Sequence, residues 1–382
     1  MRVAVVHHWF VTRGGGERVA SCLAALLPTA EIFTLLADDR GLPEDLRSRT
    51  LHTSFLSHIP GARRSHRHML PLYPAATESL DLRGFDLVVS SDSGPVKGVR
   101  VDAGATHICY CHSPMRYLYD GYEAYRAQMS GLTRLLFTAT AGHVRRWDVA
   151  AAARVTQFAA NSRYVAARIE RCYHRDSTVI YPPIEITRAR RATPGEDYLA
   201  AGRLVPYKRT ELMIEACQRL GRRLRIVGAG PEMARLKRIA GPETTFLGEL
   251  PTEALWAEYA EARALLFAAD EDFGMVPLEA QACGRPVIAY GAGGSLETVR
   301  GEQPTPTGVF FAEQTAASLA AGIERFEATE GSFDPSTTAA WAQQFGTERF
   351  LREMRALILR SCPAAAEVLL PERDLGAAAA AE

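Results

Sequence analysis

The chain has 382 residues, of which 47% are hydrophobic and 23% are charged. This composition is typical of globular domains, and the length allows two separate hydrophobic cores. Lysine plus arginine equals aspartate plus glutamate at 44 each, and we expect no nucleic-acid partner. Seven cysteines without framework spacing argue against a disulfide scaffold, and no apolar run reaches the length of about 18 residues that a membrane span needs. We therefore expect two domains in a cytoplasmic protein that contacts a membrane at most peripherally, on its inner face.

The two halves of the chain differ in charge. Residues 1–185 carry 22 basic and 17 acidic side chains, whereas residues 186–382 carry 22 and 27. Residues 50–75 combine four histidines and three arginines with large apolar residues and prolines, the amphipathic and basic character of a surface that binds an acceptor or a membrane. An undirected charge distribution, and a solvated connection packed by Phe55, Leu56, Leu70 and Leu72, are the alternatives.

The first half opens with a strand at residues 3–7, a loop with three consecutive glycines, and a helix. This order begins a doubly wound α/β domain, and the backbone amides of Gly15 and Gly16 at the helix start suit a phosphate. His112 follows a strand at 107–111, at the end of the sheet where such domains place ligand-binding groups. Pro182 and Pro183 end the pattern, so a domain boundary is expected at about 184–195. Further strands are expected at 86–91, 155–160 and 179–181. Residues 116–148 are expected to form a helical pair with packed aromatics, and a second contact surface at Arg145–Trp147 is the alternative.

The second half repeats the α/β pattern. A strand at 198–201 is followed by a loop with Arg203 and Lys208, a guanidinium and an ammonium that suit a diphosphate. The next strand, at 225–228, runs into Gly228-Ala229-Gly230. A dinucleotide fingerprint requires a third glycine at position 233, where this chain has methionine. A nicotinamide oxidoreductase is therefore disfavoured.

Residues 264–290 carry the strongest signal. Two buried strands, at 264–268 and 286–290, flank a polar loop and a short helix. Glu271 lies in the loop, and Pro277 suits a first helical position, which places Glu279 in the opening turn. A carboxylate pair beside a helix start indicates a sugar nucleotide, with its hydroxyls on the carboxylates and its phosphate on the amides. A divalent-cation site at Asp270 and Asp272 is the competing interpretation.

The string from Glu271 to Glu279, EDFGMVPLE followed by AQACGRPVI, resembles the E-x7-E signature of retaining glycosyltransferases of family 4. GRLVPYK from Gly202 and CHSPMRY from Cys111 resemble other segments of the same family, and several strings are similar to a bacterial subgroup that builds surface polysaccharides, commonly from GDP-mannose. The resemblance implies the GT-B fold, with two Rossmann-like domains facing across a cleft and a C-terminal helix that crosses back to the first domain. It implies an acceptor domain over 1–184 with the helix at about 341–362, and a donor domain over 195–340. Residues 363–382 are alanine-rich and have no clear apolar periodicity, so we expect a flexible tail there.

The resemblance also implies a reaction: transfer of a hexose with retention of the anomeric configuration, without a metal or other cofactor. It assigns roles in this reaction to particular residues. Catalysis would involve His112, Arg203, Lys208 and Glu271. Acceptor contacts are expected at His7, Trp9, Arg116 and Tyr117, and the acceptor would be a saccharide or a lipid-linked saccharide. A UDP-sugar donor, or a silent nucleotide-sugar-binding protein, are the alternatives. Donor contacts are expected at Gly15, Gly16, Arg203, Lys208, Gly230, Glu271, Phe273, Gly274, Met275, Val276 and Glu279.

Overall fold

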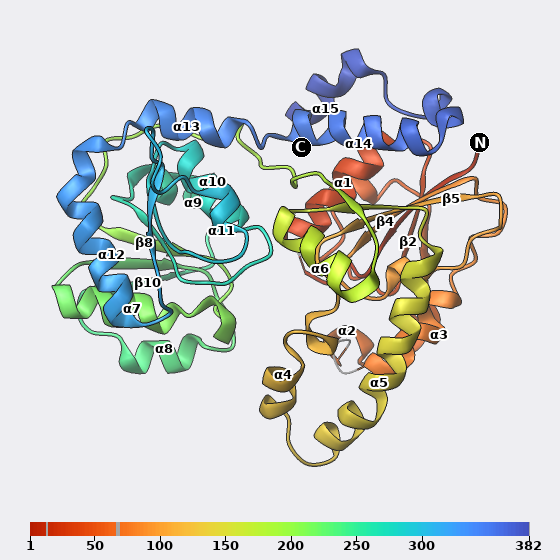
Figure 1. Cartoon of the computed structure of the whole chain (residues 1–382), viewed down its shortest axis with the longest axis horizontal. Coiled ribbons are helices and arrows are strands. Elements are labelled where there is room, and N and C mark those ends of the chain that lie inside the picture. Colours follow the sequence, from red (N-terminus) through yellow and green to blue (C-terminus); the bar gives the residue numbers. More distant parts are fainter. Residues whose placement is uncertain (13, 66–68, 382) are drawn as a thin grey trace. The chain divides into compact units, whose positions relative to one another are not determined.

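The structure of the protein is a computed structural model that describes residues 1–12, 14–65 and 69–381. The chain divides into two compact units (Figure 1). Unit 1 comprises Met1–Pro183 together with Glu348–Glu382, and unit 2 comprises Ile184–Thr347. Each unit is built around one parallel sheet with helices on its faces, which confirms the predicted fold class of two Rossmann-like α/β domains.

In the described part of unit 1, seven parallel strands form a sheet in the order β3-β2-β1-β4-β5-β6-β7. The chain order reverses between β1 and β4, and doubly wound sheets bind ligands at such a switch point. Along β1, Val3 and Val5 enter one core while Ala4 and Val6 enter another, because successive side chains of a strand point to opposite faces. The strands are β1 (Val3–His7), β2 (Glu31–Thr34), β3 (Leu51–Thr53), β4 (Leu87–Asp92), β5 (Thr106–Cys111), β6 (Gln157–Ala160) and β7 (Ser177–Val179).

Helices cover both faces of this sheet. The core that contains Val3 and Val5 is closed by α1 and α14, which lie beside each other in Figure 1. Phe350, Leu351 and Met354 of α14 are fully buried there, so the C-terminal helix packs on the first domain as predicted. The helices of unit 1 are α1 (Gly15–Leu26), α2 (Ala62–Ser65), α3 (Tyr73–Glu78), α4 (Tyr122–Gln128), α5 (Gly131–Arg154), α6 (Arg163–Tyr173), α14 (Thr347–Ser361) and α15 (Leu375–Ala381).

The prediction of a flexible tail over 363–382 is wrong for the described residues up to 381. Ala365, Leu369 and Leu375 are buried in the same core as α14. The Leu370 amide donates a hydrogen bond to the Leu26 carbonyl at the end of α1. Short turns separate the larger apolar residues of this segment, so they lack helical spacing, yet Leu369 and Leu375 are buried in the core and Val368 and Leu370 pack against it.

The segment 50–75 is only partly the surface that its composition predicts. Leu56 and Leu70 are buried, whereas Phe55 and Leu72 are 40% and 39% exposed. Residues 66–68 lie outside the described part of the chain. Across the described residues, no helix is both long enough and apolar enough to span a bilayer. Contact of this segment with a membrane therefore stays a prediction.

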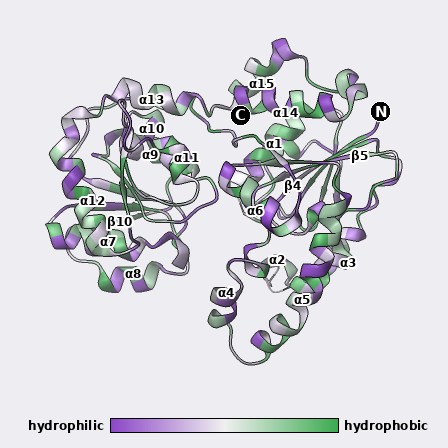
Figure 2. Ribbon diagram, in the orientation of Figure 1, coloured by the Kyte–Doolittle hydropathy of each residue, from purple (hydrophilic) through white to green (hydrophobic). Residues whose placement is uncertain are grey.

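Unit 2 holds, in its described residues, six parallel strands in the order β10-β9-β8-β11-β12-β13, with the switch point between β8 and β11. Leu266 of β11 and Ile226 of β9 pack with α7 and α12 on one face, and α10 contacts α9, α13 and β11. Figure 2 shows the hydropathy along these elements. The elements are β8 (Tyr198–Ala201), α7 (Thr210–Leu220), β9 (Leu224–Val227), α8 (Met233–Ile239), β10 (Thr244–Gly248), α9 (Thr252–Glu261), β11 (Leu265–Phe267), α10 (Met275–Ala282), β12 (Val287–Tyr290), α11 (Ser295–Thr298), β13 (Gly308–Phe311), α12 (Ala316–Thr329) and α13 (Pro335–Gln343).

Candidate active site

Lys208 and Glu271 form an ion pair at the switch point of the second sheet. Lys208 ends the turn that follows β8, and Glu271 lies in the loop that follows β11. These strands are adjacent and parallel, so their carboxyl ends bring the two loops together. The two side chains are only 14% and 18% exposed, and the Lys208 ammonium lies 5.5 Å from the centre of the Phe267 ring.

The charge of Lys208 is maintained by its neighbours. Burial is the largest single influence on Lys208 and lowers its pKa, but the charge and hydrogen bond of Glu271, together with Tyr207 and Glu279, outweigh it, and the net pKa is raised. Lys208 is therefore protonated at neutral pH. Arg203, which is exposed, lines the same pocket as Lys208 and Phe267. The two cations that the sequence predicts for a diphosphate thus share one pocket.

Glu279 lies on α10, which begins two residues before the predicted first position. Met275 is the first helical residue, so Pro277 is the third and Glu279 starts the second turn rather than the first. The helix is entered through Gly274, whose φ of 86° is in the left-handed region that favours glycine. The Tyr259 hydroxyl donates a 2.7 Å hydrogen bond to Oε2 of Glu279, which fixes this carboxylate.

Two glycines support the site because their lack of a side chain lets neighbouring loops pack closely. A Cβ at Gly230 would lie 2.2 Å from the Leu204 carbonyl oxygen, and a Cβ at Gly294 would lie 2.2 Å from Cα of Phe273. The first contact holds the loop of Arg203, and the second holds the loop of Glu271. Phe273 is buried, with its ring 5.9 Å from that of Phe345. The expected contacts of Gly230, Phe273, Gly274, Met275 and Val276 with a donor stay predictions.

The competing cation site at Asp270 and Asp272 gains no support from the geometry. A search of the described residues finds no group of three or more histidine, cysteine or acidic side chains that is arranged to hold a metal ion. A Cβ at Gly293 would lie 2.5 Å from Oδ1 of Asp270, so the glycine loop packs closely against that carboxylate. Metal independence itself stays a prediction.

In unit 1, the switch point holds a chain of three polar side chains. Nδ1 of His7, at the end of β1, lies 3.1 Å from Oγ of Ser91 and 3.2 Å from its carbonyl oxygen. The same Ser91 hydroxyl lies 2.8 Å from Nε2 of His112, which follows β5. The amide of His112 donates a 2.7 Å hydrogen bond to the Asp92 carbonyl. Ser91 therefore connects two residues that the sequence predicts separately.

The contacts of Ser91 define how the two imidazoles are protonated. Because a carbonyl oxygen only accepts, Nδ1 of His7 must carry the hydrogen, and the Ser91 hydroxyl is then left to donate to Nε2 of His112. Burial, with the neighbouring His8 and His112, lowers the pKa of His7 well below its usual range, and burial with His8 also lowers the pKa of His112. Both rings are neutral. Nε2 of His7 is a buried acceptor without a hydrogen-bond partner among the described residues.

The glycine loop of unit 1 faces these imidazoles. A Cβ at Gly16 would lie 3.4 Å from Cε1 of His7 and 3.9 Å from Nε2 of His112. Gly15 is the first residue of α1, and Glu17 follows in its first turn. Burial raises the pKa of Glu17 to about 7, although hydrogen bonds from its own amide and from Thr12 act against this. Glu17 is therefore about half ionised at neutral pH, and the phosphate role of the Gly15 and Gly16 amides stays a prediction.

Of the remaining residues predicted to contact the acceptor, only Trp9 lies with the histidines. The Trp9 ring meets His8 edge-on, with 4.3 Å between centroids, and so belongs to the histidine cluster. Arg116 is half-buried on the turn η6 (Arg116–Leu118). Tyr117 packs against the core below α5, and its buried hydroxyl has no hydrogen-bond partner among the described residues. Trp9 is thus the candidate that joins His7 and His112, and acceptor contacts of all three stay predictions.

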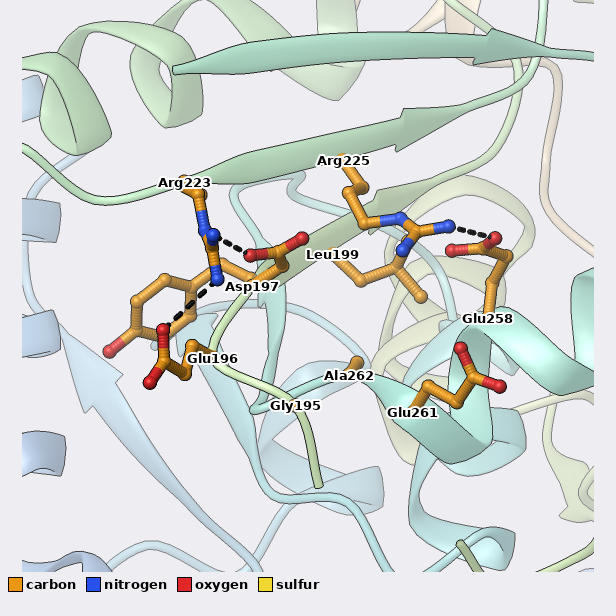
Figure 3. Close-up of a pocket in the computed structure, with 10 residues that line it drawn as sticks. Gly195, Glu196, Asp197, Leu199, Arg223, Arg225, Glu258, Glu261 and Ala262 are labelled. Carbon is orange, nitrogen blue, oxygen red and sulfur yellow. Dashed lines mark hydrogen bonds and ion pairs between the residues drawn. The ribbon is translucent and has the colours of Figure 1, made fainter. Parts of the chain in front are cut away.

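A second pocket in unit 2 lies at the opposite ends of β8 and β9 from Lys208 (Figure 3). Its arginines are paired within the pocket. Arg223 contacts Glu196 at 3.0 Å and Asp197 at 2.6 Å, and Arg225 contacts Glu258. Four carboxylates line this pocket against two arginines, so it suits an anionic ligand less than the switch point does.

Sequence reasoning misses Ser91, Glu17 and Tyr259. Two adjacent serines at the end of an apolar strand are a usable signal for Ser91, because buried hydroxyls need partners. Glu17 directly follows the three glycines, but nothing in the sequence indicates that its carboxyl is buried. Tyr259 has no signal, since its contact with Glu279 depends on how α9 packs beside α10.

The chain thus has two Rossmann-like domains, with the Lys208–Glu271 pair and the start of α10 at the switch point of the second. The family model described as "Glycosyltransferase Family 4" matches residues 13–188, and the model described as "Glycosyl transferases group 1" matches residues 185–343. The chain belongs to glycosyltransferase family 4.

Curated relatives match parts of the chain. A GDP-mannose-dependent alpha-(1-6)-phosphatidylinositol monomannoside mannosyltransferase of Mycolicibacterium smegmatis is 37% identical over 25% of this chain and 30% of its own length. The protein of the same name from Mycobacterium tuberculosis is 28% identical over 46% of this chain and 56% of its own length. A D-inositol 3-phosphate glycosyltransferase of Nocardia farcinica is 31% identical over 39% and 40%. The matches thus span about a third to a half of the length of these relatives.

Solved structures show the same fold. The Anabaena protein HepE in complex with UDP superposes with a TM-score of 0.69 and 16% identity, covering 94% of this chain and all of that one. The sucrose-phosphate synthase of Thermosynechococcus elongatus gives a TM-score of 0.71 and 20% identity, covering 96% of this chain and 100% of that one.

Proposed function

We propose that the protein is a retaining hexosyltransferase that moves mannose from GDP-mannose to a saccharide or lipid-linked saccharide acceptor, in the biosynthesis of a surface polysaccharide at the cytoplasmic face of the membrane. The observation that carries the transfer reaction is the Lys208–Glu271 pair at the switch point of unit 2. The choice of GDP-mannose as the donor is supported by two relatives, 37% and 28% identical over parts of the chain, that are named GDP-mannose-dependent mannosyltransferases.

Each charged group has a role in this proposal. Arg203 and Lys208 stabilise the negative charge that develops on the diphosphate leaving group, and Glu271 together with the amides of Phe273 to Val276 binds the transferred sugar. Glu279, which Tyr259 holds in place, binds the ribose hydroxyls. The two cations and the start of α10 replace a divalent cation, so no metal is required.

On the acceptor side, the neutral histidines bind hydroxyl groups. His112 contacts the transferred sugar, and Nε2 of His7, which has no partner among the described residues, accepts a hydrogen bond from an acceptor hydroxyl. A buried histidine with a strongly lowered pKa is a poor base, so the proton of the attacking hydroxyl passes to an oxygen of the departing phosphate. The new bond forms on the face that the leaving group vacates, which retains the anomeric configuration.

Thermal stability against a panel of GDP-, UDP- and dTDP-linked sugars tests the donor. A ligand at 100 times its dissociation constant adds about 2.7 kcal/mol to the folded state. We expect stabilisation by GDP-mannose that EDTA does not change and that Glu271→Ala weakens. Stabilisation that EDTA abolishes would assign a cation to Asp270 and Asp272. No response to any nucleotide sugar would contradict the proposal.

A UDP-sugar donor is the second candidate, because the Lys208–Glu271 pair and the start of α10 suit the diphosphate and the sugar of any nucleotide sugar and select no base. In the donor panel, stabilisation by UDP-glucose or UDP-N-acetylglucosamine without a response to GDP-mannose would favour this candidate. The anomeric carbon of the transferred sugar, followed by NMR with a 13C-labelled donor, separates retention from inversion for either one.

A further inference from the structure

The hairpin of α4 and α5 exposes a group of leucines that the fold does not use. Leu132, Leu135 and Leu136 are 69%, 65% and 52% exposed, in the first two turns of α5. Figure 1 shows this end of α5 projecting from the sheet of unit 1 next to the loop from α4, and Figure 2 shows the hydropathy of the same segment. Three large apolar side chains so close together at a projecting end are unusual on a water-facing surface.

The leucines share one face of the helix. Residues 132, 135, 136, 139, 143 and 146 recur at helical spacing, and all six are exposed. The opposite face is already packed, because Phe137 and Val144 are buried and the Phe137 ring stacks on Tyr122 of α4 at 5.4 Å. The hairpin is therefore held together from within. Removal of the leucines should leave its packing intact.

Positive charge surrounds the leucines. From Gly121 to Trp147 the chain has four arginines and a single acidic residue, Glu123. Arg134 lies between the leucines, and Arg146 continues their face of α5 after Ala139 and His143. Arg134 and Arg146 are exposed, whereas Arg126 pairs with Glu123 and Arg145 packs over the rings of Tyr119 and Tyr122. An apolar end with a basic surround matches the charge of an anionic lipid surface.

We propose that the α4–α5 hairpin is the surface through which this protein docks on a bilayer of anionic phospholipid. Leu132, Leu135 and Leu136 enter the interfacial layer, and the exposed Arg134 and Arg146 contact the headgroups. A projecting helix end can insert into a fluid bilayer, because the lipids rearrange around it, whereas a protein partner would need a groove of complementary shape. This site differs from the segment 50–75, where Leu56 and Leu70 are used in the core.

Sedimentation with phospholipid vesicles tests the proposal. We expect the wild-type chain to bind vesicles of POPC that contain about a third POPG, and to bind at least about tenfold less to pure POPC or at high salt. Leu132→Glu/Leu135→Glu should weaken binding at least about tenfold. Leu296→Glu is the matched control, because Leu296 is 58% exposed on α11 of unit 2 and should bind as wild type does. Arg146→Gln should weaken binding only to the anionic vesicles.

Three results would contradict docking of the α4–α5 hairpin on a bilayer. Absence of wild-type binding to anionic vesicles, or equal binding by the double variant, would overturn the proposal. A concentration-dependent dimer in light scattering that the double variant abolishes, without vesicle binding, would assign the face to a second copy of the chain. An unchanged thermal midpoint shows that the double variant is folded. The vesicles contain neither donor nor acceptor, so a negative result would leave the proposed reaction to be judged by the donor panel alone.

Discussion

The hydroxyl of Ser91 lies 2.8 Å from Nε2 of His112 and 3.1 Å from Nδ1 of His7. One side chain at the end of β4 thus fixes the hydrogen-bonding state of two imidazoles, one from β1 and one from the loop after β5. The proposed acceptor side of the site depends on this shared partner as much as on the histidines.

Replacing Ser91 should therefore affect turnover more than stability. Ser91→Ala removes the hydroxyl that donates to Nε2 of His112, while Nδ1 of His7 keeps the Ser91 carbonyl, and we expect a loss of about tenfold in kcat/KM for the acceptor, equivalent to one hydrogen bond of about 1.4 kcal/mol. Ser90→Ala is the matched control, since Oγ of Ser90 lies 2.8 Å from Nε2 of His107, a buried pair of the same kind on the other side of the strand. Equal losses in the two variants would show that Ser91 has only a structural role.

Glu17→Gln should stabilise the protein in a pH-dependent way. The pKa of Glu17 is raised from 4.5 to about 7, so ionisation of this group favours the unfolded chain increasingly between these two pH values and by a constant amount above them. The glutamine variant lacks this penalty. We expect the free energy of unfolding of this variant to exceed that of wild type by up to about 3 kcal/mol at pH 8, and to equal it near pH 4.5. Urea denaturation at both pH values measures this.

The exposed Glu44 of unit 1 provides the control for that experiment. Glu44→Gln should leave the free energy of unfolding within about 0.5 kcal/mol of wild type at either pH. If Glu17→Gln and Glu44→Gln behave alike at pH 8, the carboxyl of Glu17 is not buried as described.

Glu271→Gln should destabilise unit 2. The variant leaves the buried ammonium of Lys208 without its principal partner, which we expect to cost about 1–3 kcal/mol at pH 7.5. Because the raised pKa of Lys208 gives stability that is lost as the pH rises through it, the difference from wild type should shrink in strongly alkaline solution. Glu249→Gln, at an exposed position of the same unit, should have no comparable effect.

Gly294→Ala should displace the loop of Glu271. The added methyl group would meet Cα of Phe273 at 2.2 Å, and backbone atoms cannot yield cheaply. We expect a loss of about 1–3 kcal/mol in stability and weaker donor binding. Gly331→Ala serves as the control, because a Cβ there meets nothing within 4 Å. Thermal denaturation with and without donor separates the two effects.

The fold is predictable where strands are apolar throughout. β1 and β8 have the predicted bounds, since continuous apolar runs mark buried parallel strands. The edge strand β3, with the sequence LHT, escapes prediction because it is short and carries polar residues. The ordered tail escapes it for a related reason: its apolar residues are spaced by turns and packed against α1 and α14, which only the folded chain brings near.

The candidate site is predictable where its residues belong to one contiguous string. Glu271, Gly274 and Glu279 are such a string, and local signals predict a loop followed by a helix there, although the helix begins two residues earlier than Pro277 indicates. The pairing of Lys208 with Glu271 requires the strand order of the sheet. The contacts of Ser91 with His7 and His112 join three separate strands, and no local pattern specifies them.

Calorimetric titration of GDP-mannose into wild type and Lys208→Met, both in EDTA, tests the central claim most directly. We expect saturable binding by wild type and at least about tenfold weaker binding by the variant, because a buried methionine cannot stabilise a diphosphate. Lys237→Met, which removes an exposed lysine of α8 in the same unit, should bind as wild type does. Equal affinities for Lys208→Met and wild type, or no binding of GDP- and UDP-sugars by wild type, would contradict the account.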